Sequence, residues 1–183
     1  EVKNEFKKFD LNKYDEIVFC GYGEPLVRID EVIEVAKYIR SISNIKIRVN
    51  TNGLSDLIHN KKTAVLLKDN IDAVSISLNA PNKTVYNKVT RPKFGEKSFE
   101  ALLNFATDCK KYIDEVYLHN IFYKGTSDYG RAAFSKVKNT CIQLPVTRLK
   151  MFLIIQICSL GHKVLRILLL LCTKFNNFVE WNP

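Results

Sequence analysis

Three apolar segments of the chain each end in polar residues that could bind a small ligand. Glu24 follows the first segment, Asn52 ends the second and Asn79 follows the third. Glu24 and Asn52 are 28 residues apart, and Asn52 and Asn79 are 27 apart. A carboxylate accepts hydrogen bonds from an ammonium group, while an amide can donate to and accept from a hydroxyl. The regular spacing predicts one small-molecule site, although each Asn could equally serve a turn after its strand.

The residues around Glu24 have an unusual order. EIVFC is followed directly by Gly21-Tyr22-Gly23-Glu24-Pro25. Glycine lets a ligand approach the backbone closely, and proline stiffens the exit from a strand. We interpret the segment as a backbone held open so that an ammonium group reaches main-chain carbonyls and the Glu24 carboxylate.

The elements that must position these residues alternate between short apolar runs and helical patterns. The expected strands are 16–20, 46–53, 73–82 and 115–122, and the expected helices are 29–42 with Asp30 as N-cap, 63–69 and 98–109. This order predicts an α/β fold with a parallel sheet and helices outside, either an open sheet or a partial barrel. Such folds bind ligands at the carboxyl ends of their strands, where the three polar clusters should therefore meet.

With GYGEP, VNTNG and SISLNAP in this order and spacing, the chain resembles the radical S-adenosylmethionine (SAM) enzymes. More narrowly it resembles the TatD-associated radical SAM proteins, which have a Gly-Tyr-Gly-Glu-Pro form of the motif. The resemblance covers about residues 14–116 and implies a fragment of a partial (β/α)6 TIM-like barrel, from its second to its fifth strand. It also implies SAM, a [4Fe–4S] cluster and reductive cleavage of SAM to a 5′-deoxyadenosyl radical.

The resemblance also implies which residues contact SAM. They are Gly23, Glu24, Asn50, Asn52, Ser77 and Asn79. Gly23 and Glu24 match the strand end that binds the methionyl amino group in the family. The others match segments that contact the ribose and carboxylate, and Ser77 is the best candidate because its side chain should point inward from its strand. The sequence identifies no catalytic residue and no substrate.

The cysteines do not form a cluster motif. They are Cys20, Cys109, Cys141, Cys158 and Cys172, and no two lie two or three residues apart. The family's cluster needs three thiolates in a C-x3-C-x2-C loop, so we predict that this chain alone neither holds the cluster nor cleaves SAM. Because the chain starts at Glu1 rather than Met, we expect a fragment.

Two alternatives to a radical SAM enzyme domain remain open. One is a non-catalytic remnant that folds partly and binds SAM or a nucleoside weakly. The other is an unrelated α/β enzyme for a phosphorylated metabolite, but the sequence contains no glycine-rich phosphate loop.

Charge divides the chain into two parts. Residues 1–116 have 19 basic and 17 acidic residues, whereas 117–183 have nine basic and two acidic ones. We therefore expect a partial-barrel domain over 1–116 and a basic, apolar tail over 117–183 without regular period, which a shifted reading frame would explain. No basic cluster stands out, so a nucleic-acid partner is not indicated.

The longest uncharged run, 151–161, has eleven residues, below the ~18 that a membrane span needs. No membrane span is therefore expected, and the default localisation is cytoplasmic.

Overall fold

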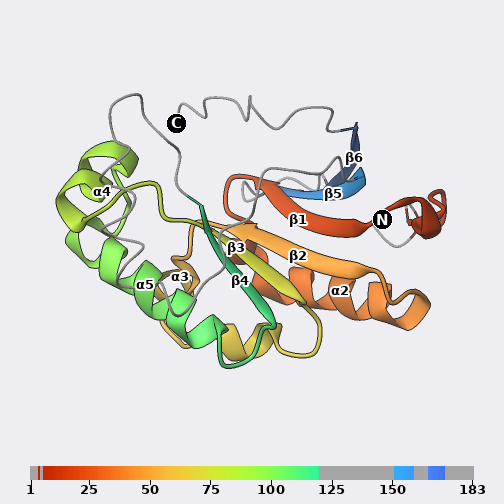
Figure 1. Ribbon diagram of the computed structural model, residues 1–183, viewed down its shortest axis with the longest axis horizontal. Helices are drawn as coiled ribbons and strands as arrows, with labels where there is room; N and C mark the ends of the chain where they lie inside the picture. Colours follow the sequence, from red (N-terminus) through yellow and green to blue (C-terminus); the bar gives the residue numbers. More distant parts are fainter. Residues whose placement is uncertain (1–3, 5, 120–150, 159–164, 172–183) are drawn as a thin grey trace.

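The computed structural model describes residues 4, 6–119, 151–158 and 165–171 (Figure 1). Six strands form one sheet in the order β4-β3-β2-β1-β5-β6. The strands are β1 Glu16–Tyr22, β2 Lys46–Thr51, β3 Ala73–Ser77, β4 Glu115–His119, β5 Met151–Cys158 and β6 Leu165–Leu171. The α-helices are α2 Ile29–Ile42, α3 Ser55–His59, α4 Lys83–Thr90 and α5 Ser98–Cys109. Short 3-10 helices are η1 Leu11–Lys13, η2 Pro25–Arg28, η3 Ala64–Leu67 and η4 Gly95–Lys97.

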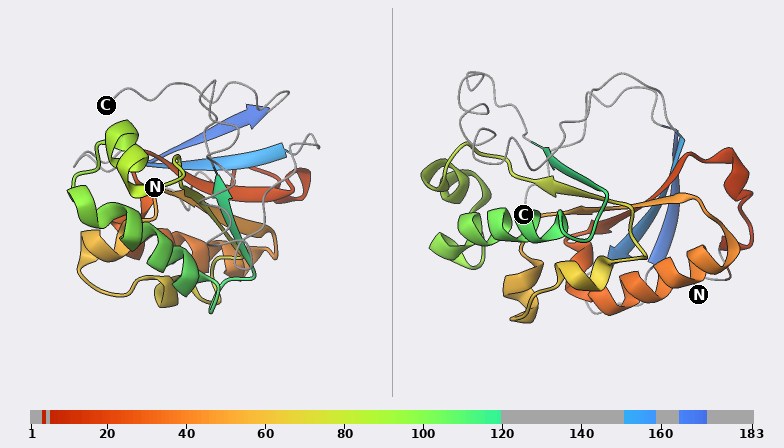
Figure 2. Two further views of the ribbon diagram at one scale, coloured as in Figure 1. Left: turned by 60° about the vertical axis from the view of Figure 1, so that its left-hand side comes forward. Right: turned by 60° about the horizontal axis from the view of Figure 1, so that its bottom comes forward.

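The first four strands are parallel and alternate with helices, which confirms the predicted α/β fold and is consistent with a partial TIM-like barrel. Helices α2, α3 and α5 lie on one face of the sheet (Figures 1 and 2). A strand buries alternate side chains on each face. In β1 the helix-facing residues Ile17 and Phe19 are completely buried. Burying such a side chain contributes about 1.5–3 kcal/mol.

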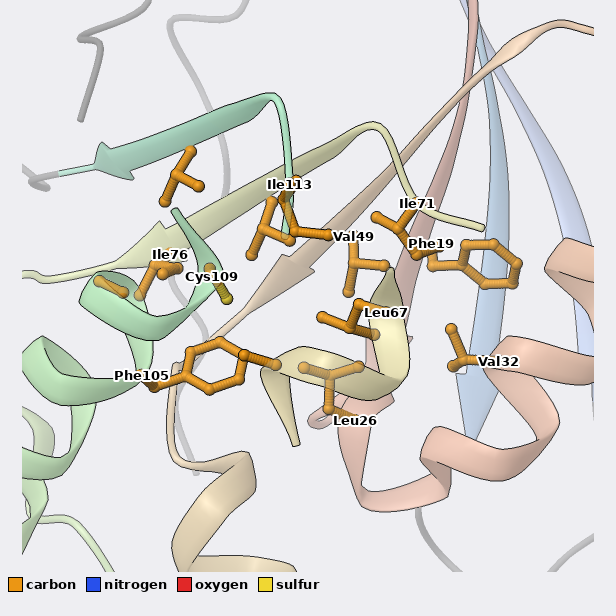
Figure 3. Packing of buried hydrophobic residues seen from close by; sticks show 14 of the residues in the cluster. Phe19, Leu26, Val32, Val49, Leu67, Ile71, Ile76, Phe105, Cys109 and Ile113 are labelled. Atoms are coloured by element: carbon orange, nitrogen blue, oxygen red, sulfur yellow. The ribbon is translucent and has the colours of Figure 1, made fainter. Parts of the chain in front are cut away.

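The helix-facing core is continuous along the four parallel strands β1 to β4. Phe19 and Val32 lie at one end of it, and Ile76 and Phe105 at the other (Figure 3). Leu67 of η3 fills the space between them and is completely buried (Figure 3). The short 3-10 turns therefore contribute core residues as well as connections.

The opposite face of the same strands, which we call the inner face, is more polar. Strand register places Val18 beside Arg48, Asn50 beside Ser75, and Ser77 beside His119. Asn50, Ser77 and His119 lie on this face near the carboxyl ends of β2, β3 and β4.

The start of the first long helix differs from the prediction. Asp30 is not an N-cap but lies in the first turn of α2. The turn begins earlier, at Pro25, and the Glu24 side chain caps it by accepting from Leu26 N. A proline at the first helical position has no N–H to satisfy, so Glu24-Pro25 is a favourable start that the apolar periodicity did not reveal.

Two further helices were not predicted, two strands end earlier than predicted, and a third is described only in part. The strands expected over 46–53 and 73–82 end at Thr51 and Ser77, because the Asn, Gly and Pro residues that follow favour turns. Helices α3 and α4 are short and carry few apolar residues, so their hydrophobic pattern is weak. The expected strand 115–122 is described only as Glu115–His119, and 120–122 lie outside the described residues.

The segment expected to lack regular period contains two described strands. β5 lies parallel beside β1, and β6 runs antiparallel to β5. Their sequences, MFLIIQIC and LRILLLL, are nearly continuous apolar runs, which cannot be assigned to strand or helix by periodicity alone. The proposed domain boundary at 116 falls inside β4, and both the division and the shifted reading frame remain predictions.

Within the described ranges, no helix is long and apolar enough to cross a membrane.

Gly53 tests how tightly the end of β2 packs on the core. Its φ is +77°, and a Cβ there would lie 2.9 Å from Ile76 Cγ2 and 3.0 Å from Leu102 Cγ. We expect Gly53→Ala to lower the free energy of unfolding by about 3 kcal/mol, from backbone strain and overpacking together. Gly95→Ala is the matched control, because φ is +57° but nothing lies within 4 Å, and it should cost about 1 kcal/mol. Urea unfolding of both variants measures the difference, and equal losses would show that packing at Gly53 is unimportant.

Candidate functional site

The carboxyl ends of β1, β2 and β3 lie at one edge of the sheet (Figure 1). The connections that follow these strands carry Glu24, Asn52 and Asn79. Glu24 and Asn52 are in direct contact, since Asn52 N donates to Glu24 Oε2 at 2.7 Å. The interval of 28 residues therefore corresponds to neighbouring strand ends, as one β–α repeat requires.

The Glu24 carboxylate accepts three hydrogen bonds. Its Oε1 accepts from Leu26 N at 3.0 Å and from Thr51 Oγ1 at 2.7 Å, and its Oε2 accepts from Asn52 N. Because a carboxylate oxygen can accept two hydrogen bonds, Oε2 has capacity for one more donor. Glu24 thus fixes η2 and the end of β2 against each other and can still accept from an ammonium group.

Burial raises the pKa of the Glu24 carboxyl above its usual value, although the hydrogen bonds from Thr51, Asn52 and Leu26 oppose the shift. A buried carboxylate lacks the solvation that stabilises its charge. A cation brought next to Oε2 would lower this pKa and favour the ionised form. A positively charged ligand group beside Glu24 would therefore offset the cost of holding its charge away from water.

Gly23 turns the chain sharply between β1 and Glu24. Its φ is +96°, and an isolated antiparallel bridge joins Gly21 to Gly23. Residues with a Cβ rarely adopt this conformation, so glycine is needed for the turn. Gly23 is exposed, so its backbone is accessible at this edge of the sheet. The side chain of Tyr22 lies outside the described residues.

Asn52 and its neighbour Thr51 serve the turn after β2. Asn52 Oδ1 accepts from Leu54 N at 2.9 Å, and Thr51 Oγ1 accepts from Gly53 N at 3.0 Å. These are the side-chain turns expected of Asn and Thr. The Asn52 side chain therefore serves the turn, although its carbonyl oxygen can accept one further hydrogen bond and its amide nitrogen can still donate. Thr51, which sequence reasoning missed, positions Glu24.

Asn50 and Ser77 lie on the inner face as predicted from strand alternation. Asn50 Oδ1 accepts from Arg48 Nη1 at 3.2 Å, and Arg48 Nε donates to Glu16 Oε1 at 3.1 Å. Arg48 and Glu16 are 8% and 6% exposed, so this ion pair is buried. Asn50 is thereby held by a charged network, whereas Ser77 has no side-chain hydrogen bond within the described residues.

Asn79 and His119 meet where β3 and β4 end. Leu78 N and Asn79 N both donate to His119 O, at 2.9 and 3.3 Å, and Asn79 has a φ of +56°. Among the described residues, Asn79 Oδ1 and His119 Nε2 are buried without a hydrogen-bond partner. An unsatisfied buried polar atom costs about 1–3 kcal/mol. A hydroxyl-bearing ligand at this edge would relieve that cost.

The sequence gives no reason to single out His119, because a single histidine without a ligand-spaced partner is usually incidental. The signal that could have found it is its position on β4, level with Ser77 on β3. Burial, and secondarily the positive charge of Arg48, lower the pKa of His119. The imidazole is therefore biased toward its neutral form, in which one ring nitrogen accepts a hydrogen bond.

The described residues do not fit an iron–sulfur cluster. Cys109 is buried in the helix-facing core and Cys20 lies on β1, with its pKa raised chiefly by burial. No group of three or more His, Cys, Asp or Glu side chains in the described part could hold a metal ion. Cys141 and Cys172 lie outside the described residues, and only the backbone of Cys158 is described.

Comparison with known families agrees with this geometry. The model of the radical SAM superfamily matches residues 1–128. The chain belongs to the radical SAM superfamily. Membership implies SAM and an iron–sulfur cluster as the cofactors of the family. The narrower resemblance to TatD-associated proteins is not part of this finding.

Curated relatives carry the name of an RNA-modifying enzyme. The probable dual-specificity RNA methyltransferase RlmN of Prochlorococcus marinus (strain NATL1A) is 34% identical over 105 residues, 54% of this chain. The dual-specificity RNA methyltransferase RlmN of Wigglesworthia glossinidia brevipalpis is 32% identical over 120 residues, 62% of this chain. The chain spans 28% of the length of each relative. No solved structure matches it significantly.

The raised pKa of Glu24 predicts a specific pH dependence. The folded state binds the proton of the Glu24 carboxyl more tightly than the unfolded state does. Protonation of Glu24 therefore stabilises the fold fully below the unfolded pKa, and this stabilisation is lost as pH rises through the folded pKa. The free energy of unfolding of the wild type should therefore fall, relative to Glu24→Gln, as pH rises from about 4 to neutrality. Urea unfolding of both proteins across this range measures the difference, in which the shifts of all other carboxyls cancel. If the free energies of unfolding of the two proteins change with pH in parallel, the pKa of Glu24 is not raised in the folded state.

Proposed function

We propose that the carboxyl edge of β1, β2 and β3 is the SAM-binding site of a radical SAM enzyme domain, formed within residues 1–116. The observation that carries the proposal is the Glu24 carboxylate, which is half-buried, fixed by three hydrogen bonds and still able to accept one more. In this proposal the methionyl ammonium donates to Oε2 and to main-chain carbonyls next to Gly23. The positive φ of Gly23 opens the backbone for that approach.

The ribose and carboxylate of SAM would lie toward β3 and β4. Ser77 offers a hydroxyl on the inner face, and Asn79 offers a buried carbonyl oxygen without a partner in the described part. Asn50 and Asn52 are less available, because their carbonyl oxygens each already accept one hydrogen bond, from Arg48 Nη1 and Leu54 N. The site thus combines acceptors for an ammonium group with groups suited to hydroxyls.

The family's chemistry needs a cluster that the described residues do not fit. When bound, a [4Fe–4S] cluster supplies the electron that cleaves SAM to a 5′-deoxyadenosyl radical. We derive no step through it for these 183 residues. The finer assignment to the TatD-associated group remains a hypothesis based on the Gly-Tyr-Gly-Glu-Pro motif alone.

SAM binding tests the proposed site through Asn79. Asn79→Gly removes the side chain at φ +56° without backbone strain, and Asn60→Gly makes the same change at φ +50° in an exposed turn after α3. We expect Asn79→Gly to weaken SAM binding about tenfold, the value of one good hydrogen bond, and Asn60→Gly to leave it unchanged. Titration calorimetry measures both. Equal affinities in the two variants would contradict a role of Asn79.

Iron analysis separates an enzyme from a non-catalytic remnant that binds SAM weakly. We expect the 183-residue chain to bind SAM but to retain less than one iron per chain after anaerobic reconstitution with iron and sulfide, because its cysteines have no cluster spacing. About four irons per chain, with the absorption of a [4Fe–4S] cluster, would show that these cysteines hold it after all.

A further inference from the structure

The positive charge of the described first part of the chain is concentrated in one short segment. Residues 1–82 carry twelve basic and twelve acidic residues, and 98–119 carry two basic and four acidic ones. Between them, 83–97 carry five basic residues and one acidic residue. The small net charge of residues 1–116 conceals this cluster, which is why no nucleic-acid signal was read from the sequence.

Four of these cations are free to meet a partner. They are the side chains of Lys88, Arg91, Lys93 and Lys97, and we call them the α4 surface. All four are exposed, and none has a side-chain partner within the described residues. The acid of the segment, Glu96, is already engaged by Lys83 at 2.6 Å and by Asn87 at 2.9 Å. Other lysines of the described part do have acidic partners, as Lys62 has in Asp108 and Lys46 in Glu115.

The α4 surface stands next to the proposed SAM site. α4 follows the loop that contains Asn79, and both views of Figure 2 place it beyond the carboxyl ends of β3 and β4. It is held firmly on the domain, since the buried Tyr86 ring packs on Phe99 of α5 with centroids 5.5 Å apart. A long ligand lying on this surface would therefore pass the edge of the sheet that carries Asn79 and Glu24.

Arg91 occupies a position that its side chain does not favour. It ends α4 with φ +44° and ψ +55°, the left-handed conformation in which Gly or Asn is usual. Its backbone N–H donates to Asn87 O as any residue could. Since nothing in the described part holds the guanidinium, the strain is explained if the side chain binds something outside the chain.

We propose that the α4 surface binds the phosphate backbone of an RNA whose nucleotide is presented to the SAM site. Only the claim that a nucleotide reaches the SAM site rests on the proposed function; phosphate binding by the α4 surface does not. Exposed lysine and arginine side chains without acidic neighbours are the electrostatic footprint of phosphate binding. Two of the relatives are named as RNA methyltransferases, which agrees with an RNA rather than an acidic protein as the partner.

The salt dependence of RNA binding tests the surface. Fluorescence anisotropy of a short labelled single-stranded RNA of mixed sequence gives Kd over a series of potassium chloride concentrations. For Lys88→Gln/Lys93→Gln/Lys97→Gln we expect the slope of log Kd against log salt to become shallower by about 2, since each lost phosphate contact in a single strand removes about 0.7. The control Lys37→Gln/Lys68→Gln/Lys110→Gln has the same net charge, and its exposed lysines lie outside the α4 surface. It should leave the slope unchanged. Equal effects of the two triple variants, or none, would overturn the proposal.

Substitution of Arg91 provides a second test, which distinguishes RNA binding from a purely structural role of this residue. Arg91→Asn should raise the Tm, because Asn suits the left-handed conformation, and yet weaken RNA binding with a slope shallower by about 0.7. A higher Tm with unchanged RNA binding would show that Arg91 does not contribute to RNA binding by the α4 surface.

Two further measurements separate the possible failures. Displacement of the RNA by polyglutamate at equal charge concentration would identify an acidic protein as the partner and overturn the RNA proposal. SAM calorimetry on the same proteins reports the proposed function independently. Intact SAM binding with no RNA binding refutes the α4 surface alone, whereas RNA binding without SAM binding refutes the proposed function.

Discussion

The Glu24 carboxylate is the interaction on which the edge of the sheet depends. It caps the turn that leads into α2 and binds the end of β2 through Thr51 and Asn52. An acceptor-only group is needed there, because three donors converge on it and two of them are backbone N–H groups that must be satisfied. Burial of this charge raises its pKa, so the same interaction that orders the edge also prepares it for a cationic ligand.

The two faces of the sheet differ in polarity. Toward α2 and α5 it presents apolar residues such as Phe19 and Ile76, which close-pack with the helices. Toward the inner face it presents the Arg48–Glu16 pair, Asn50 and Ser77. A buried ion pair is weak evidence for stability, because desolvation offsets most of the attraction. Its position beside Asn50 and its influence on the pKa of His119 suit a role in setting the polarity of the inner face.

Membership of the radical SAM superfamily and the geometry of the edge address different questions. The family match covers residues 1–128 and names the cofactors. The geometry shows which side chains remain available for a ligand once the turns are satisfied. Asn52 is largely used by its own turn, whereas Asn79 and His119 keep buried atoms without partners in the described part. Similarity in sequence therefore shows the family, and hydrogen bonding shows which side chains at this edge remain available to a ligand.

The sequence by itself determined the alternation of strands and helices, the parallel sheet and the meeting of Glu24 with Asn52, because hydrophobic period and repeat length are local properties of the chain. Only the tertiary structure showed that Glu24 caps η2, that His119 lies level with Ser77, and that β5 pairs with β1. These depend on strand register and on contacts between distant segments, which no local pattern encodes. The α4 surface depends on both the sequence and the fold. Its charges can be counted in the sequence, but their exposure and their lack of partners in the described part are properties of the fold.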